Sequence, residues 1–379
     1  MYRERATEPL LAARTGPGTG TEAPEAGART GPGTGTEAPE AGARTGPGTG
    51  TRTVPGAEPE PGAESGERGG YTGGFGRWDR LAGVRNRPQR PFTEPGSLYF
   101  PPELHPVALH PLVTAGGPEQ VEWLLLRRLH DYLDFTTQLE TLAVIPVVTA
   151  ISRGRSGLRL PEAMRADAFK IVTDEAWHAQ VSYDFGQQVA RATGVPAERP
   201  DGGGPPAFTE RLDVIRDRLP HEIRGVEALL FAIVSETLIS GILAEIPRDE
   251  RLPGSLREHV RDHAEDEGRH HVYFRAVLRH LWAALTPAER GAVGPQVPAA
   301  IQAFLAPDLA RAAEDLRTLG LPERNVEQVL AESWPGEKVA ADMAGSARSL
   351  VRYFGEAGAL DDPATRDSFE NAGLLCSDA

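Results

Sequence analysis

The sequence has one cysteine among its 379 residues, Cys376, close to the carboxyl end. A single cysteine excludes an intrachain disulfide framework and the zinc or iron–sulfur sites that need several thiolates. No continuous apolar run approaches the roughly 20 residues of a membrane-spanning helix. Basic residues are outnumbered, and the formal net charge of −14 argues against a nucleic-acid partner. We therefore expect a cytoplasmic protein that binds neither membranes nor nucleic acid.

Large apolar side chains are scarce in the first fifth of the chain. Positions 4–69 hold no aromatic residue, and their large aliphatic residues are Leu10, Leu11 and Val54. A 15-residue unit rich in Gly, Pro and Thr occupies 13–27 and recurs at 28–42. Such a segment buries too little apolar surface to offset the entropy lost on ordering. We predict that residues 1–75 form a disordered tail.

Helical periodicity dominates the rest of the chain, and no segment shows the alternation typical of a strand. The long helical patterns cover about 119–153, 162–194, 222–246 and 256–285. Pro146 predicts a kink in the first of them, and Thr286 to Glu289 has the form of a capping box. The predicted fold is all-α: a ferritin-like four-helix bundle with additional helices in residues 76–360. We predict a flexible carboxyl-terminal tail over 361–379.

The stretch 256–285 carries the most informative pattern. His263, Glu267 and His270 are spaced four and three residues apart, so they share one face of a helix. A carboxylate between two imidazoles on a buried face is costly unless a cation lies opposite, and a metal ion meets that need. The alternative is a solvated helix face, because the stretch carries further polar residues: Glu258, His259, Asp262, Glu265 and His271.

A second copy of the motif favours the metal site over the solvated face. Residues 174–178 read Asp-Glu-Ala-Trp-His, and residues 266–270 read Asp-Glu-Gly-Arg-His. Two Glu-x-x-His motifs on separate helices supply half of the ligand set of a carboxylate-bridged di-iron bundle. In that architecture, each of two other helices contributes one glutamate.

Glu140 and Glu236 are the candidates for those two glutamates, because each lies in an apolar helical run. A buried glutamate almost always has a partner of opposite charge. For Glu140 or Glu236 considered alone, an arginine explains the burial as well as a metal ion does. Together they complete the order Glu, Glu-x-x-His, Glu, Glu-x-x-His. Two Fe(II) ions would cancel the four carboxylate charges, and manganese fits the same oxygen-rich site. The predicted metal ligands are Glu140, Glu175, His178, Glu236, His263, Glu267 and His270.

Asp174 and Asp266 each precede a ligand glutamate. We predict that each accepts a hydrogen bond from the ring N–H of a ligand histidine, which fixes the tautomer of that ring. The helix pairing of such bundles leads us to expect that each aspartate serves the histidine of the other helix.

The ligands, in this order and spacing, resemble those of the di-iron arylamine N-oxygenases, the p-aminobenzoate N-oxygenase family. The resemblance runs from about Tyr99 to about Tyr353, and its diagnostic position is His263, one turn before the last Glu-x-x-His. It implies two iron ions, O2 as co-substrate and no catalytic side chain beyond the ligands. The implied monooxygenase converts an aromatic amine to a hydroxylamine, nitroso or nitro product in natural-product biosynthesis. The chain has no flavin, haem or iron–sulfur motif, so a reductase or ferredoxin must supply electrons, and a homodimer is compatible with the sequence.

The substrate pocket is expected beside the first ligand, at Tyr132, Phe135 and Thr136. These side chains include no cation for a substrate carboxylate, so a larger or carrier-tethered aromatic amine is as compatible as a free aminobenzoate. Two other activities stay open, namely C–H hydroxylation on the same centre and ferritin-type iron oxidation. A third neutral imidazole favours oxygen transfer to a nucleophilic nitrogen lone pair over cleavage of a strong C–H bond. N-oxygenation is therefore the preferred prediction.

Overall fold

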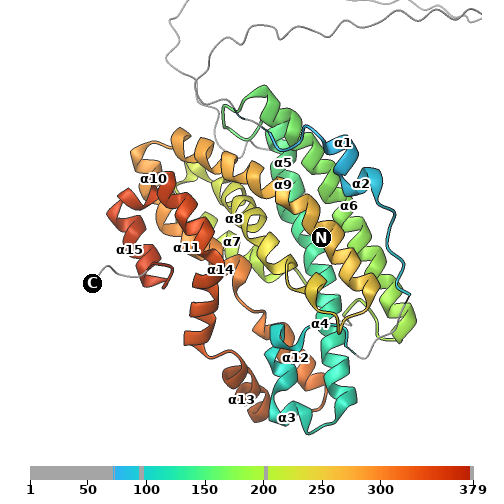
Figure 1. The fold of residues 1–379 in the computed structure, drawn as a ribbon. Helices are drawn as coiled ribbons and strands as arrows, with labels where there is room; N and C mark the ends of the chain where they lie inside the picture. Colours follow the sequence, from blue (N-terminus) through green and yellow to red (C-terminus); the bar gives the residue numbers. More distant parts are fainter. Residues whose placement is uncertain (1–70, 72, 94–97, 200–203, 376–379) are drawn as a thin grey trace, which may run out of the picture. The chain divides into compact units, whose positions relative to one another are not determined.

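The computed structural model describes residues 71, 73–93, 98–199 and 204–375, and all regular secondary structure in these residues is helical. The predicted all-α, ferritin-like bundle is confirmed. The elements α4, η3 and α5 form one continuous helical stretch of the bundle, and this stretch packs against α6. Helix α8 packs against α9 (Figure 1). The bundle elements are α4 (Pro118–Leu139), η3 (Glu140–Val144), α5 (Ile145–Ser152), α6 (Glu162–Thr193), α8 (Val226–Leu243) and α9 (Gly254–Ala284).

Shorter helices surround the bundle. Those before and within it are α1 (Trp78–Leu81), α2 (Gly83–Asn86), η1 (Pro102–Leu104), η2 (Pro106–Leu109), α3 (Pro111–Thr114), α7 (Ala207–Arg218), η4 (His221–Ile223) and η5 (Ile246–Arg248). Those after it are α10 (Pro287–Val293), η6 (Gly294–Gln296), α11 (Val297–Leu305), α12 (Leu309–Thr318), α13 (Glu323–Ser333), α14 (Gly336–Glu356), η7 (Ala359–Asp361) and α15 (Pro363–Asn371). The predicted capping box is confirmed at α10, where Thr286 and Glu289 bond each other's backbone.

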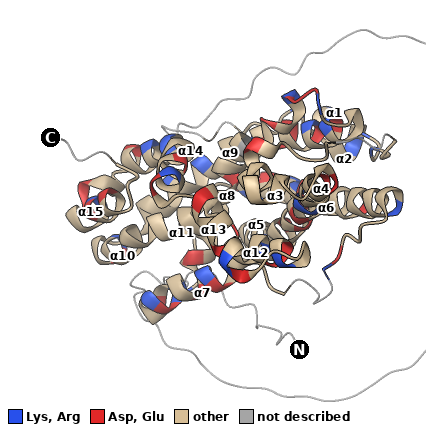
Figure 2. Ribbon diagram, turned by 90° about the horizontal axis from the view of Figure 1, so that it is seen from below, with Lys and Arg blue, Asp and Glu red and all other residues tan. Residues whose placement is uncertain are grey.

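Helix α8 lies at the centre of the hydrophobic core. Its sequence is apolar on nearly every side, because α7, α9, α11 and α14 all pack against it. Acidic and basic residues are interspersed over the outer helices, whereas α11 carries neither (Figure 2). A charged side chain in α8 therefore lies far from the solvated surface, and Glu236 is such a side chain.

A π-helical turn interrupts the first bundle helix at its predicted ligand. Helix α4 ends at Leu139, and the π-helical turn η3 begins at Glu140. Pro146, where the sequence predicts a kink, follows directly in α5. Proline lacks the N–H that an α-helix uses at each position, and π turns inside helices are frequently found at functional sites.

The same stretch, Pro118–Ser152, is long and apolar enough to cross a membrane by length and composition. The expectation that no stretch approaches a membrane span therefore does not hold for it. However, 50% of its most apolar window is buried inside the protein, and Glu140 within it is fully buried. These features are typical of a bundle core helix.

Residues 361–375 are ordered, contrary to that part of the flexible tail predicted over 361–379. Helix α15 follows η7, and Asp362 caps it by accepting the backbone N–H of Thr365. Phe369 in this helix is fully buried and lies 6.1 Å from the ring of Phe354 in α14. One buried aromatic side chain thus anchors the helix. Residues 376–379 lie outside the described part.

The ordered fold also begins earlier than predicted. Of the predicted tail, residues 1–70 lie outside the described residues, but Tyr71 and Phe75 belong to the hydrophobic core. The hydroxyl of Tyr71 donates to Asp167 at 3.0 Å, and Phe75 is 2% exposed. The predicted tail of residues 1–75 therefore wrongly includes these two side chains.

This boundary gives a truncation prediction. Removal of residues 1–70 should leave the melting temperature unchanged, because that range has almost no core-forming side chains. Removal of 1–75 also deletes Phe75, and loss of a buried phenylalanine costs roughly 3 kcal/mol. For a domain of this size, that loss lowers the melting temperature by roughly 5–10 °C. Circular dichroism melts of both truncated proteins check this, and identical melts would contradict it.

Candidate metal centre

The structure brings all seven predicted ligands together in the middle of the bundle. None of these side chains is more than 5% exposed, and all four glutamates are 0% exposed. Four helical elements supply them: η3 carries Glu140, α6 carries Glu175 and His178, α8 carries Glu236, and α9 carries His263, Glu267 and His270.

Two of the glutamates lie between the histidines. The carboxylate oxygens of Glu175 are 2.9 Å from His178 Nδ1 and 2.8 Å from His270 Nδ1. Glu267 Oε1 lies 3.3 Å from both of these nitrogens and 3.1 Å from His263 Nε2. Two ligands about 2.1 Å from one ion and at right angles are about 3 Å apart. These separations are therefore those of ligand atoms that share a metal ion.

The other two glutamates extend the cluster in different directions. Glu140 Oε1 is 3.8 Å from His263 Nε2, and Glu236 Oε2 is 3.6 Å from His270 Nδ1. Two overlapping groups have ligand atoms within 4.8 Å of one another: Glu175, His178, Glu267 and His270 in one, and Glu140, Glu175 and Glu236 in the other. Since Glu175 belongs to both, the geometry fits two neighbouring ion positions with a shared carboxylate.

The carboxylates fit a metal better than any partner within the protein. Both carboxylate oxygens of Glu140, and both of Glu236, are buried without a hydrogen bond. No ion pair in the described part of the chain joins any of the four glutamates to a lysine or arginine. Burial raises the pKa of Glu140 and Glu236 well above the ordinary value, and the neighbouring glutamates raise it further. Such a cluster costs several kcal/mol per ionised group unless cations compensate.

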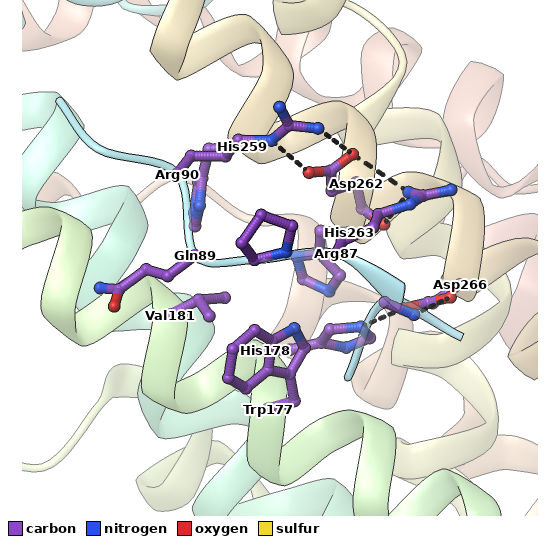
Figure 3. Close-up of a pocket in the computed structure, with 12 residues that line it drawn as sticks. Arg87, Gln89, Arg90, Trp177, His178, Val181, His259, Asp262, His263 and Asp266 are labelled. Carbon is purple, nitrogen blue, oxygen red and sulfur yellow. Dashed lines mark hydrogen bonds and ion pairs between the residues drawn. The ribbon is translucent and has the colours of Figure 1, made fainter. Parts of the chain in front are cut away.

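The two aspartates bond the ligand histidines in the crossed arrangement that the sequence predicts. Asp266 of α9 lies 3.2 Å from Nε2 of His178 in α6 (Figure 3). Asp174 of α6 lies 3.3 Å from Nε2 of His270 in α9. In both rings Nε2–H is thus directed at a carboxylate, which leaves Nδ1 free to bind a metal.

Residues 86–358 match the family model described as p-aminobenzoate N-oxygenase AurF. The chain belongs to this family. A 4-aminobenzoate N-oxygenase of Streptomyces thioluteus is 24% identical over 268 residues, which cover 69% of this chain and 78% of the relative. The resemblance seen in the sequence is confirmed, and the protein is an N-oxygenase enzyme. All seven ligands fall inside the matched range.

A small cavity in the N-oxygenase reaches two of the ligand histidines from the side of α2. Its lining includes Trp177, His178, His259 and His263, and residues 87–90 cover it (Figure 3). The sequence places His259 among solvated residues, but it is 5% exposed and stacks on Phe185 with ring centroids 4.6 Å apart. Burial, and then the neighbouring histidines, lower the pKa of His259 to about 3. It is therefore a neutral core histidine.

The predicted substrate residues do not line one common pocket. Tyr132 and Thr136 are buried on the side of α4 that faces the predicted ligands. Burial raises the pKa of Tyr132, and the nearby Glu140 and Glu267 raise it further. Phe135 turns away, to the rings of Phe208 and Phe304 at 6.0 and 6.1 Å. The part of Tyr132 and Thr136 in a substrate pocket stays a prediction.

Sequence reasoning missed the contribution of the first ordered residues of the N-oxygenase. The ring of Phe75 lies parallel to that of His270, with centroids 6.1 Å apart and planes 11° from parallel. Trp78 and Gly83 contact the two aspartates. The available signal was that Tyr71, Phe75 and Trp78 are the first aromatic residues after a long stretch without any.

Proposed function

We propose that this N-oxygenase holds two iron ions and uses O2 to oxidise an aromatic amine to its hydroxylamine, and further to nitroso or nitro products. The observation that carries the proposal is the cluster of four fully buried carboxylates and three histidines, whose carboxylates pair with no lysine or arginine among the residues that the structure describes. Family membership supports the reaction class. Two divalent ions would neutralise the four carboxylates, and a pair of ferrous ions supplies the O2-activating chemistry.

Each side chain has a role that its position supports. Glu175 and Glu267, which lie between histidines, would hold metal at the centre of the cluster. His178 and His270 would bind through Nδ1, Glu140 would add a donor beside His263, and Glu236 would add one beside His270. Burial, and then the neighbouring His178, hold the pKa of His263 below its usual range. A neutral imidazole at this position presents a lone pair on Nε2 and adds no charge.

The reaction requires electrons that the chain does not carry. Oxidation of an amine to a hydroxylamine consumes one O2, two electrons and two protons, and it releases one water molecule. We propose a separate reductase or ferredoxin as the donor, since the sequence has one cysteine and no flavin or haem motif. A ferroxidase differs from this stoichiometry, because it oxidises iron as its substrate and consumes no amine.

The amine that we propose is aromatic, either free or tethered to a carrier. The relative of known name acts on 4-aminobenzoate, so that compound is the first one to test. The nearest arginine before Tyr132 in α4 is Arg128, which stacks over Phe100 at 5.0 Å and lies about 120° around the helix from Glu140. It precedes Glu140 by 12 residues, which is about 18 Å along a helix. Arg128 is therefore not placed to hold the carboxylate of a free aminobenzoate beside the cluster.

Metal analysis tests the proposed centre. Protein loaded anaerobically with Fe(II) and then desalted should contain two iron ions per chain, because the donor set supports two neighbouring positions. Elemental analysis by mass spectrometry gives the stoichiometry. A value near one iron per chain, or retention of zinc alone under these conditions, would contradict the proposal. Loading with Mn(II) in parallel shows whether manganese competes for the same positions.

A further inference from the structure

Trp78 is hydrogen-bonded to one of the two aspartates behind the metal ligands. Its indole Nε1–H donates to both carboxylate oxygens of Asp174, at 2.9 and 2.8 Å. Asp174 in turn faces Nε2 of His270 at 3.3 Å. Trp78 lies in the short helix α1 and is 8% exposed, so the bond is shielded from water. A buried chain of contacts therefore runs from Trp78 through Asp174 to a ligand histidine.

Gly83 makes the equivalent contact with the other aspartate. Its backbone N–H lies 3.0 Å from Asp266 Oδ2, and the same oxygen is 3.2 Å from Nε2 of His178. A Cβ atom at position 83 would lie 2.7 Å from this oxygen, closer than side chains tolerate. The absence of a side chain is therefore what lets the backbone approach Asp266.

Asp174 relies on contacts from residues 75–83 more than Asp266 does. Asp266 also pairs with Arg269 of its own helix. The hydrogen bonds of Asp174 within the described residues come from Trp78 and His270 alone. Phe75 adds a parallel ring contact to His270. His270 and its aspartate thus depend more on this segment than His178 does.

We infer that residues 75–83, which precede the family-matched range of 86–358, form a positioning element that fixes both Glu-x-x-His histidines through Asp174 and Asp266. The inference rests on the proposed metal centre and deepens it. An aspartate that loses its outer donor can rotate, and the imidazole bonded to it then rotates as well. Because Nδ1 is the atom available to the metal, small ring rotations displace a ligand atom. Partners behind metal ligands commonly contribute tenfold to hundredfold in metal affinity.

Two variants of the full-length chain test the element, each with a matched control. Trp78→Phe removes the indole donor, and Trp282→Phe makes the same change at a tryptophan that is 1% exposed and has no hydrogen-bond partner for Nε1 among the described residues. Gly83→Ala adds the crowded Cβ, whereas Gly336→Ala, also at the first position of a helix, adds a Cβ with nothing within 4 Å. The probe is Co(II), titrated into metal-free protein against a competing chelator, and its visible absorption reports the ligand geometry. Melting temperatures of the metal-free proteins are measured alongside.

We expect Trp78→Phe and Gly83→Ala to weaken Co(II) binding about tenfold and to change the visible absorption of bound cobalt. The two control variants should match the wild type in both measurements. If the wild type binds two Co(II) and both test variants bind with unchanged affinity and spectrum, the positioning role is wrong while the metal centre stands. Equal weakening in Trp282→Phe would also overturn it, since the effect would then follow from lost packing. A wild type that binds no Co(II) would overturn the centre and this inference together.

Discussion

Glu267→Ala is expected to fold normally, to lose the two-metal centre and to have no measurable N-oxygenation. One carboxylate oxygen of Glu267 lies within 3.1–3.3 Å of the ligand nitrogens of all three histidines. Its removal takes away the carboxylate that these three proposed ligand histidines share. Metal-ion stabilisation of a reaction is worth several kcal/mol, and each 1.36 kcal/mol is tenfold in rate, so we expect a loss of at least roughly a hundredfold.

Iron analysis and product formation are measured on the same preparation of Glu267→Ala, and iron should fall below one per chain. Glu265→Ala is the matched control, because Glu265 lies on the same helix and is exposed. Its ion pair with Arg87 is a surface contact, worth about 0–1 kcal/mol. Two irons per chain in Glu267→Ala, or equal losses in both variants, would show that Glu267 is not a shared ligand.

His263→Ala should separate metal binding from turnover. His263 is not part of either closely spaced ligand group, although its Nε2 is 3.1 Å from Glu267 and 3.8 Å from Glu140. The variant should therefore retain close to two irons per chain. Loss of a neutral donor that sets the geometry of one ion should lower turnover by roughly tenfold to hundredfold, the range found for partners that tune metal sites.

The comparison for His263→Ala is His271→Ala on the same helix. His271 is half-buried and lies 3.1 Å from the hydroxyl of Tyr353, away from the cluster. Iron content and the rate of a single turnover are followed in both variants. An unchanged rate in His263→Ala would remove the assigned role of the third histidine. Loss of both irons would show that His263 is needed to hold the metal.

The sequence could group the candidate ligands on common helix faces because offsets of three and four residues on a helix are geometrically unambiguous. Glu267 and His270 must share a face in any straight helix, and so must Glu175 and His178. The all-α fold followed from the same periodicity. The crossed pairing of Asp174 and Asp266 required only that α6 and α9 face each other.

The same helical geometry explains one partial failure. Phe135 precedes Glu140 by five residues, which turns it about 140° away around the helix, so it packs against Phe208 and Phe304. Thr136, at four residues, is only about 40° away. The predicted pocket grouped neighbours in the sequence rather than neighbours on one helix face.

Other features depend on contacts between distant parts of the chain. Trp78 reaches Asp174 across 96 residues, and no local pattern marks a side chain whose partner lies so far away. His259 looks solvated by residue type, but Phe185 from α6 covers it. The carboxyl-terminal helix looks like a tail because a single aromatic residue, Phe369, anchors it.

The most direct test of the central claim is a turnover experiment with labelled oxygen. The iron-loaded protein, a ferredoxin and its reductase are incubated under 18O2 with 4-aminobenzoate and with a panel of larger aromatic amines, and the products are analysed by mass spectrometry. The account predicts at least one amine whose nitrogen carries 18O, in a reaction that metal-free protein does not perform. Oxygen found only on carbon, or oxidation of iron with no amine consumed, would contradict it.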